Sequence, residues 1–241
     1  TAICSYFLIG FDKEHRTTRL AALMAMLVTG IGAVALLIGA LVLRADHGTF
    51  QLPEIAARVA DGAGGDPTVA AALIAVAALA KSAQVPLHFW LPGAMAAPTP
   101  VSAFLHSAAM VAAGVLVLGR VYPIVAASDA VRDGLLAVGL ASIAVGGAIA
   151  LTRDGFKQVL AYSTISQYGY VVTLYGIGGR AGAGAAAFYV VAHALAKSAL
   201  FMTAGAVTMA TGARRLSEVG GLARALPLLA GASAVAAATL S

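Results

Sequence analysis

Apolar residues run along most of the chain in long stretches that short polar segments interrupt. Six stretches approach the length of about 20 residues with which a helix crosses a bilayer core of roughly 30 Å. They cover approximately residues 21–43, 68–91, 100–121, 134–152, 156–177 and 182–211, and shorter apolar stretches occupy 1–10 and 225–241. This pattern predicts an all-α fold, a polytopic bundle of transmembrane helices.

The chain starts and stops inside apolar stretches. We therefore expect both ends to be cuts, and residues 1–241 to be one fragment of a larger transmembrane domain with about six complete and two truncated membrane helices. A signal peptide needs a charged region before its apolar core, and none is recognisable, although a truncated start would hide one.

Composition and charge agree with a membrane protein. Of the 241 residues, 61 % are apolar and 10 % are charged, whereas a globular domain carries about 25 % charged residues. The net charge of +5 is spread over short loops rather than one face, so no nucleic-acid partner is expected. If loops alternate between two sides, eight Lys and Arg oppose five, which predicts that the first group is cytoplasmic. That group is Lys13, Arg16, Arg19, Arg153, Lys157, Arg214, Arg215 and Arg224.

The residue types that hold cofactors are sparse. Cys4 is the single cysteine, which excludes an internal disulfide and gives no zinc, iron–sulfur or haem pattern. It lies in an apolar stretch, so we expect a buried, inert thiol. The histidines of the apolar stretches have no carboxylate or thiolate beside them in a complete segment, so neither a metal nor another cofactor is expected.

Two lysines, Lys81 and Lys197, lie near the middle of apolar stretches. A central lysine costs about 2.5–3.5 kcal/mol on insertion scales, and such residues usually face the bundle interior and mark a transport path. Burial disfavours the charged ammonium, so a lysine there can take up and release protons. The alternative is a lysine paired with a buried acid, which would have to come from outside these residues.

Two histidines extend this polar set. His106 has Ser102 four residues before it, and Tyr189, His193 and Lys197 repeat the same spacing along one helix face. A ladder of this kind can relay protons. A single buried histidine is more often a satisfied core residue, but the combination with the two lysines favours the relay.

Pro86 removes a backbone donor shortly after Lys81 and predicts a discontinuous helix near Lys81–Pro86. Broken helices at membrane depth are tolerated only against protein or a water-lined cavity. We interpret His88, together with Trp90, as an interfacial anchor.

Other polar residues receive simpler interpretations. Ser163 and Gln167 share a helix face, where packing and a hydrated path are equally compatible. His15 and His47 are predicted to be solvated in loops, and Lys157 and Arg153 to fix topology.

The stretch that carries Lys81 and His106 reads AKSAQVPLHFWLPGAMAAPTPVSAFLHSAAMVAAGV, and DGFKQVLAYSTISQYGY and AHALAKSALF follow it. In this order they resemble the antiporter-like membrane subunits shared by Mrp-type Na⁺/H⁺ antiporters and respiratory complex I. The resemblance implies that Lys81 is a central proton carrier on a broken helix and that His106, His193 and Lys197 belong to the same path. It also implies a glutamate partner upstream of Thr1 and a further lysine or glutamate after Ser241.

Between the two branches, SYFLIGFDKEH and TAGAVTMATG are more similar to the large, A-type Mrp subunit than to the L-type subunit of complex I. Ala112 and Tyr189 depart from that pattern, because relatives can carry a lysine at the first position and a histidine at the second. The implied partners are other membrane subunits of an Mrp-type or complex I-type assembly, protons with Na⁺ as the exchanged ion, and the lipid of a bacterial plasma membrane.

The sequence thus predicts proton translocation through a buried Lys and His path as part of a cation/proton antiporter. The alternatives are a proton-pumping subunit of NADH-quinone oxidoreductase, a structural subunit that transports nothing, and a subunit for bicarbonate or other solute uptake. The chain shows no catalytic site of its own, so any enzyme activity would belong to a translocase complex.

Overall fold

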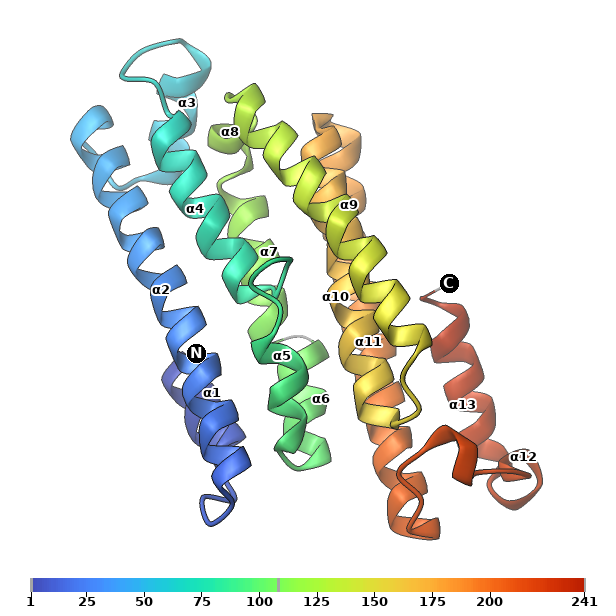
Figure 1. The fold of residues 1–241 in the computed structure, drawn as a ribbon. Helices are drawn as coiled ribbons and strands as arrows, with labels where there is room; N and C mark the ends of the chain where they lie inside the picture. The colour runs from blue at the N-terminus through green and yellow to red at the C-terminus, as the bar shows by residue number, and fades with distance from the viewer. Residues whose placement is uncertain (1, 108, 241) are drawn as a thin grey trace.

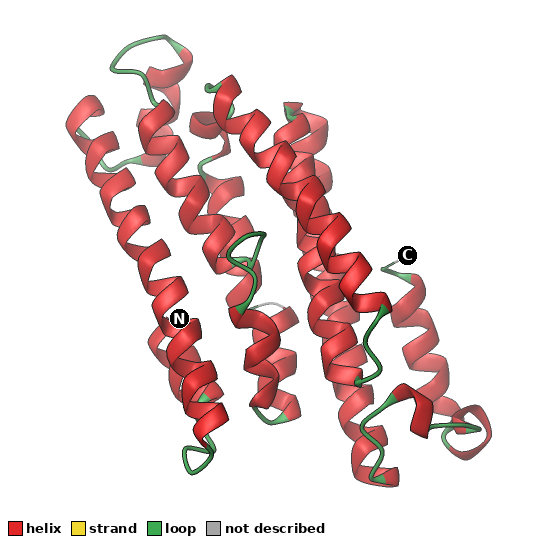
Figure 2. Cartoon of the chain, viewed as in Figure 1, coloured by secondary structure: helices red, strands yellow, loops and turns green. Residues whose placement is uncertain are grey.

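The computed structural model describes residues 2–107 and 109–240, which are helical nearly throughout and form no β-strand (Figure 2). The N-terminal half contains α1 (Ala2–Ile9), α2 (Arg16–His47), α3 (Leu52–Ala60), α4 (Thr68–Lys81), α5 (Trp90–Gly93), the 3₁₀ turn η1 (Ala94–Ala96), α6 (Thr99–Ser107) and α7 (Met110–Arg120). The remainder contains α8 (Tyr122–Val125), α9 (Asp129–Leu151), α10 (Phe156–Ile177), α11 (Gly179–Thr211), η2 (Leu216–Glu218), α12 (Leu222–Ala225) and α13 (Pro227–Ala238).

The predicted all-α bundle is confirmed. Its long helices run side by side, with α2 packed on α4, α4 on α7, α6 on α11, and α10 between α9 and α11 (Figure 1). Within the described residues, 4 helical stretches are long and apolar enough to cross a membrane: Arg16–His47, Thr99–Arg120, Asp129–Leu151 and Gly179–Thr211. The end stretches predicted at 1–10 and 225–241 correspond to α1 and α13, and their outermost residues, Thr1 and Ser241, lie outside the described residues.

Loops alternate between the two ends of the bundle, as the count of Lys and Arg on the two sides assumed. At one end α3 packs against α8, and the hydroxyl of Thr68 donates to that of Ser128 at 2.9 Å. At the other end the α1–α2 turn, the α9–α10 turn and the linker after α11 surround a common pocket. The positions predicted to be cytoplasmic in these three segments therefore lie on one side.

Apolar side chains cover the outside of the bundle as well as its inside. On α2, Leu27, Ile31 and Leu41 are exposed while Ala22, Ala25 and Val28 are buried. A water-soluble monomer rarely exposes a continuous apolar surface of this kind. The outer faces of the long helices are therefore suited to lipid, and small side chains fill the inner contacts.

Glycines allow α9 and α10 to approach closely. A Cβ atom at Gly139 would lie 2.9 Å from the carbonyl oxygen of Gly169, and one at Gly169 would lie 2.8 Å from that of Gly139. No larger residue fits at either position without separating the helices. Close backbone approach through small residues is the usual packing mode in lipid, where the hydrophobic effect does not hold helices together.

Two expectations about single residues are wrong. His47 ends α2 and is 2 % exposed, because Gly64, in the loop between α3 and α4, packs directly on its imidazole ring. Ile55 of α3 is buried at the same end. Cys4 is exposed, not buried. The apolar neighbours of Cys4 in the sequence therefore did not imply burial of its thiol.

Candidate functional site

The helix that carries Lys81 is discontinuous, as predicted. α4 ends at Lys81, and the chain continues through Ser82–Phe89 before α5 begins at Trp90. Ala83 adopts a φ of 52°, which is unusual for a residue with a Cβ atom. Backbone conformations of this kind cost about 1–3 kcal/mol and cluster at functional sites.

Side chains from neighbouring helices satisfy the backbone groups that the break releases. The Ser142 hydroxyl of α9 accepts from the Val85 N–H at 3.0 Å. The indole N–H of Trp90 donates to the carbonyl oxygen of Ala80 at 3.1 Å, and Trp90 is fully buried. Trp90 is therefore a structural part of the break, and its predicted role as an interfacial anchor is wrong. His88 lies half-buried in the same irregular segment.

Lys81 lines a cavity of about 560 Å³ between α1, α2, α4 and α7. Its neighbours in the lining include Thr29, Ala77 and Gly114, and Cys4 lies at the same cavity. Lys81 is half-buried and forms no ion pair or hydrogen bond with the described residues. An ammonium group on a mostly apolar wall is costly unless water or an acid reaches it.

Lys197 is the most deeply buried cation, at 1 % exposure on α11. Its ammonium donates to the Ser163 hydroxyl at 2.5 Å and to the Leu160 carbonyl oxygen at 3.2 Å, both on α10. No carboxylate lies within ion-pair distance of it among the described residues. A buried ammonium that has only neutral acceptors is expensive, because no opposite charge compensates its desolvation.

Two buried histidines lie beside Lys197. His193 precedes it by one helical turn, and His106 comes from α6; they are 1 % and 0 % exposed. Lys197 interacts electrostatically with both. Neither imidazole has a hydrogen-bond partner among the described protein atoms; instead His193 packs edge-on against Tyr168 with ring centroids 4.5 Å apart, and His106 lies 4.9 Å from Phe201. The structure thus brings three of the four predicted site residues into one cluster.

A band of buried neutral polar groups joins the break after Lys81 to α10, the helix that packs on α11. Ser82 donates to the Val111 carbonyl oxygen at 2.7 Å, and the Gln84 amide donates to the Ile165 carbonyl oxygen at 3.3 Å. Ser82 and Gln84 are fully buried. On the other side, the Tyr168 hydroxyl donates to the Ser107 carbonyl oxygen at 3.1 Å. These separate hydrogen bonds tie the break to α7 and α10, and α10 to the end of α6; in the described part of the chain none of them includes Lys81 or Lys197.

The sequence did not predict that Ser82, Gln84 and Tyr168 form these contacts between helices. Ser82 and Gln84 were part of a recognised motif, but their spacing gave no helix face because they lie in the irregular segment. Tyr168 follows Gln167 in an apolar stretch, and this polar pair was the sequence signal that could have indicated a functional position. Only the packing of α10 against α6 and α11 brings it next to His193.

Other predicted contacts are weaker. The Ser102 hydroxyl bonds to the Pro98 carbonyl oxygen at 3.4 Å rather than to His106. Tyr189 is half-buried and faces Tyr170 at a centroid distance of 6.3 Å, so it shares the stripe of His193 without a hydrogen bond to it. Over the described part of the chain, no group of three or more His, Cys, Asp or Glu is placed to hold a metal ion.

Comparisons with known proteins match this arrangement. The family model described as "NADH:quinone oxidoreductase/Mrp antiporter, TM" covers residues 1–241. The A/B-type subunit of a probable K⁺/H⁺ antiporter from Rhizobium meliloti is 40 % identical over 243 residues, which are 100 % of this chain and 24 % of that protein. Chain 5 of the NAD(P)H-quinone oxidoreductase of Synechocystis is 40 % identical over 211 residues, covering 85 % of this chain and 30 % of that one.

Solved structures give the same result. A chain of the Mrp complex from a Dietzia species superposes with a TM-score of 0.89 and 40 % identity, covering 98 % of this chain and 26 % of that chain. A chain of the archaeal membrane-bound sulfane sulfur reductase superposes with a TM-score of 0.87 and 26 % identity, with 98 % of this chain and 49 % of that one covered. The present chain thus spans about a quarter of the first of these curated relatives.

Proposed function

The chain belongs to the transmembrane family of NADH:quinone oxidoreductase and Mrp antiporter subunits, and on this premise we propose that it carries the central part of a proton path in a cation/proton antiporter. The exchanged cation would be Na⁺ or K⁺. The path uses Lys81, His106, His193 and Lys197. The whole of residues 1–241 would form one piece of a larger antiporter-like domain that assembles with other membrane subunits, in a bacterial plasma membrane.

The observation that carries the proposal is the environment of Lys197. Its ammonium is fully buried, has two imidazoles beside it, and finds a hydroxyl and a carbonyl oxygen but no carboxylate among the described residues. Buried ionisable groups without such a partner are expensive and characteristic of ion pathways. A structural role would instead require an acid from outside residues 1–241 to pair with Lys197.

Like-charge repulsion supplies the driving force within the cluster. Because His106, His193 and Lys197 interact electrostatically, a proton that arrives on one imidazole disfavours the positive charge on the others. Arrival of a proton at His193 therefore promotes release from Lys197. Ser163 accepts from the ammonium and would take that proton while its own hydroxyl hydrogen, which bonds to the Leu160 carbonyl oxygen, passes to water.

The polar band provides the route from Lys81. Water would have to carry a proton from Lys81 past the Ser82 hydroxyl to the Tyr168 hydroxyl beside His193, because these hydroxyls donate to backbone carbonyl oxygens and not to one another. Hydroxyls can pass a proton along a chain of hydrogen bonds that water completes. Moving one charge across the membrane is worth about 2.3 kcal/mol per 100 mV, so the path can use or build a membrane potential.

The test is proton flux in sealed vesicles that contain the full-length parent complex, comparing wild type with Lys81→Ala at matched assembly. We expect the flux to be lost while assembly is retained. Unchanged flux would exclude Lys81 as a carrier and favour a structural role.

A complex I-type subunit is the second candidate, because the Synechocystis relative is as identical to this chain as the antiporter relative. The same vesicles distinguish the two. Exchange driven by an imposed Na⁺ or K⁺ gradient supports the antiporter, whereas flux that requires quinone reduction supports the complex I type.

A further inference from the structure

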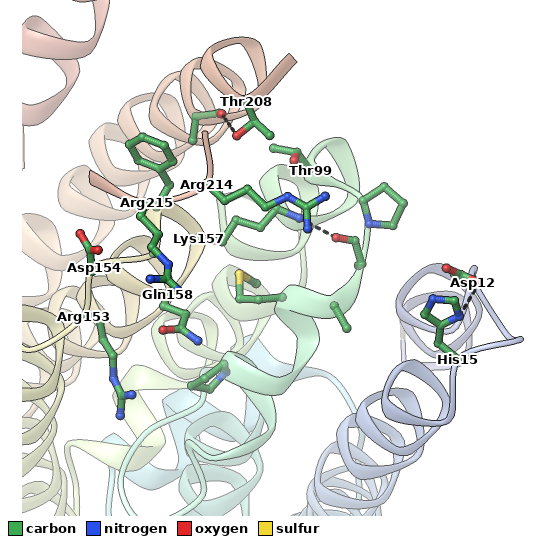
Figure 3. A pocket seen from close by; sticks show the side chains of 18 of the residues that line it. Asp12, His15, Thr99, Arg153, Asp154, Lys157, Gln158, Thr208, Arg214 and Arg215 are labelled. Atoms are coloured by element: carbon green, nitrogen blue, oxygen red, sulfur yellow. Dashed lines mark hydrogen bonds and ion pairs between the residues drawn. The ribbon is translucent and has the colours of Figure 1, made fainter. Parts of the chain in front are cut away.

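A basic pocket of about 1020 Å³ lies at the end of the bundle, outside the proposed proton path (Figure 3). The α9–α10 turn, the linker after α11, the segment around η1 and the α1–α2 turn form its walls. We define the basic pocket by its charged residues. Its four cations are Arg153, Lys157, Arg214 and Arg215, and its two carboxylates are Asp12 and Asp154.

Both carboxylates already have partners. The two Asp154 oxygens accept from the N–H and the hydroxyl of Ser217, at 3.0 and 2.5 Å. Asp12 lies 3.8 Å from the imidazole of His15, across the pocket from the cations. The two carboxylates offset part of the cationic charge, Asp154 through Arg215, and four cations against two carboxylates leave the pocket net positive.

Two of the four cations also have partners outside the pocket interior. Arg215 lies 3.8 Å from Glu218, and the guanidinium of Arg153 lies over the Tyr162 ring at 5.3 Å. Lys157 and Arg214 differ, because neither forms an ion pair with any carboxylate in the described part of the chain. Lys157 donates one hydrogen bond to the Ala97 carbonyl oxygen at 2.7 Å and keeps two N–H groups.

Lys157 and Arg214 converge. Figure 3 shows the Arg214 guanidinium beside the Lys157 ammonium, and the two charges interact. Like charges this close repel unless an anion lies between them. A guanidinium beside an ammonium offers a planar pair of donors and a point charge, which together match the oxygens of a phosphate group.

The backbone holds this arrangement in place. The Phe156 N–H donates to the Arg214 carbonyl oxygen at 3.2 Å, and the Leu216 N–H donates to that of Asp154 at 2.8 Å. The Glu218 carboxylate accepts from the N–H groups of Arg214 and Arg215, at 2.9 and 3.2 Å. The linker after α11 is thus pinned to the start of α10, so the cations are preorganised and do not lie on a free loop.

We propose that this basic pocket binds a phosphate-type anion, namely the headgroup of an anionic phospholipid or free inorganic phosphate. The location favours a lipid, because the pocket lies where α10 begins and where α11, a helix long and apolar enough to span a membrane, ends. Basic pockets between helices on the cytoplasmic side bind such headgroups. Leu151, Met209 and Leu216, each next in sequence to a residue of the pocket lining, are exposed apolar side chains.

The test uses the delipidated full-length parent complex and follows its thermal stability during titration. Cardiolipin, phosphatidylcholine and inorganic phosphate are added in separate experiments. The variants are Arg214→Gln, the charge-preserving Arg214→Lys, and Arg224→Gln as a matched control, because Arg224 is exposed on α12 outside the pocket.

We expect stabilisation by cardiolipin and none by phosphatidylcholine. Arg214→Gln should raise the half-saturating concentration about tenfold or more, as loss of a charge-assisted hydrogen bond implies, while Arg214→Lys has a smaller effect and Arg224→Gln none. Stabilisation by inorganic phosphate with the same dependence on Arg214 would identify the free anion as the source. Equal responses in all variants, or no response to either anion, would overturn the proposal.

Discussion

Replacement of Lys197 by methionine separates transport from stability. Methionine has nearly the length of lysine and fills irregular core space, so Lys197→Met leaves little cavity. The Leu160 carbonyl oxygen keeps hydrogen bonds from Thr164 at 2.8 Å and from Ser163 at 3.1 Å. No buried polar group is therefore left without a partner.

The energies of the charged and apolar side chains nearly cancel. The two hydrogen bonds of the ammonium contribute about 1.5–3 kcal/mol each, while the desolvation of a buried ion costs several kcal/mol. We expect Lys197→Met to change the free energy of unfolding by no more than about 2 kcal/mol in either direction. Lys197→Ala should cost about 2–5 kcal/mol, because it also leaves a cavity.

The assay compares the two variants in the full-length parent complex. Proton flux is measured in sealed vesicles, and the amount of assembled complex and its resistance to denaturation are measured in parallel. Lys197→Met should assemble normally and lose proton flux. Flux that persists in this variant, or a loss of stability as large as that of Lys197→Ala, would refute the reasoning that the lysine is retained for transport.

Two further predictions concern the scaffold. Gly114→Ala would drive a Cβ atom into the Ala78 carbonyl oxygen and should destabilise the protein by about 1–3 kcal/mol or more. Gly184→Ala, at an open helical position, should be neutral or stabilising by up to about 1 kcal/mol. Denaturation curves of the two variants test this prediction, and equal effects would contradict it. The side-chain and backbone hydrogen bonds from Ser217 lower the pKa of Asp154 below its ordinary 3.8. Their stabilising effect is therefore present above that pH and is lost as the pH falls below it. Hydrogen exchange at the Ser217 amide, corrected for the intrinsic exchange rate, should become faster in that acidic range, and a corrected rate that does not change with pH would contradict the prediction.

The sequence predicted most of the helices because lipid imposes a strong pattern. The stretch expected at 156–177 coincides with α10, and Pro86 correctly predicted the break after α4. The bounds expected for the 182–211 stretch nearly match those of α11, because Gly178 with φ 87° and Gly212 with φ 78° adopt conformations found at helix ends. Glycine and proline act through local backbone geometry, which a sequence displays directly.

Side-chain burial at the bundle ends was harder to predict. His47 was expected in solvent and Trp90 at the interface, yet both are buried. Their burial depends on partners far along the chain or on the folded break, namely Gly64 for His47 and the Ala80 carbonyl oxygen for Trp90. Polarity along a sequence does not specify such contacts.

The site shows the same division. Helical spacing placed His193 beside Lys197, since both belong to one face of α11. The approach of His106 from α6 and of Tyr168 from α10 depends on how three helices pack, and no local pattern encodes it. The geometry of the cluster of His106, His193 and Lys197 therefore required the structure.

One comparison tests the proton path most directly, because the protein contains its own control. His193 and His47 are both buried imidazoles without hydrogen-bond partners among the described protein atoms, but only His193 lies in the proposed path. Proton flux should be measured in vesicles with His193→Gln and His47→Gln at matched assembly. The account predicts that His193→Gln abolishes flux and that His47→Gln preserves it; flux that survives His193→Gln, or that falls equally in both variants, would contradict the proposed path.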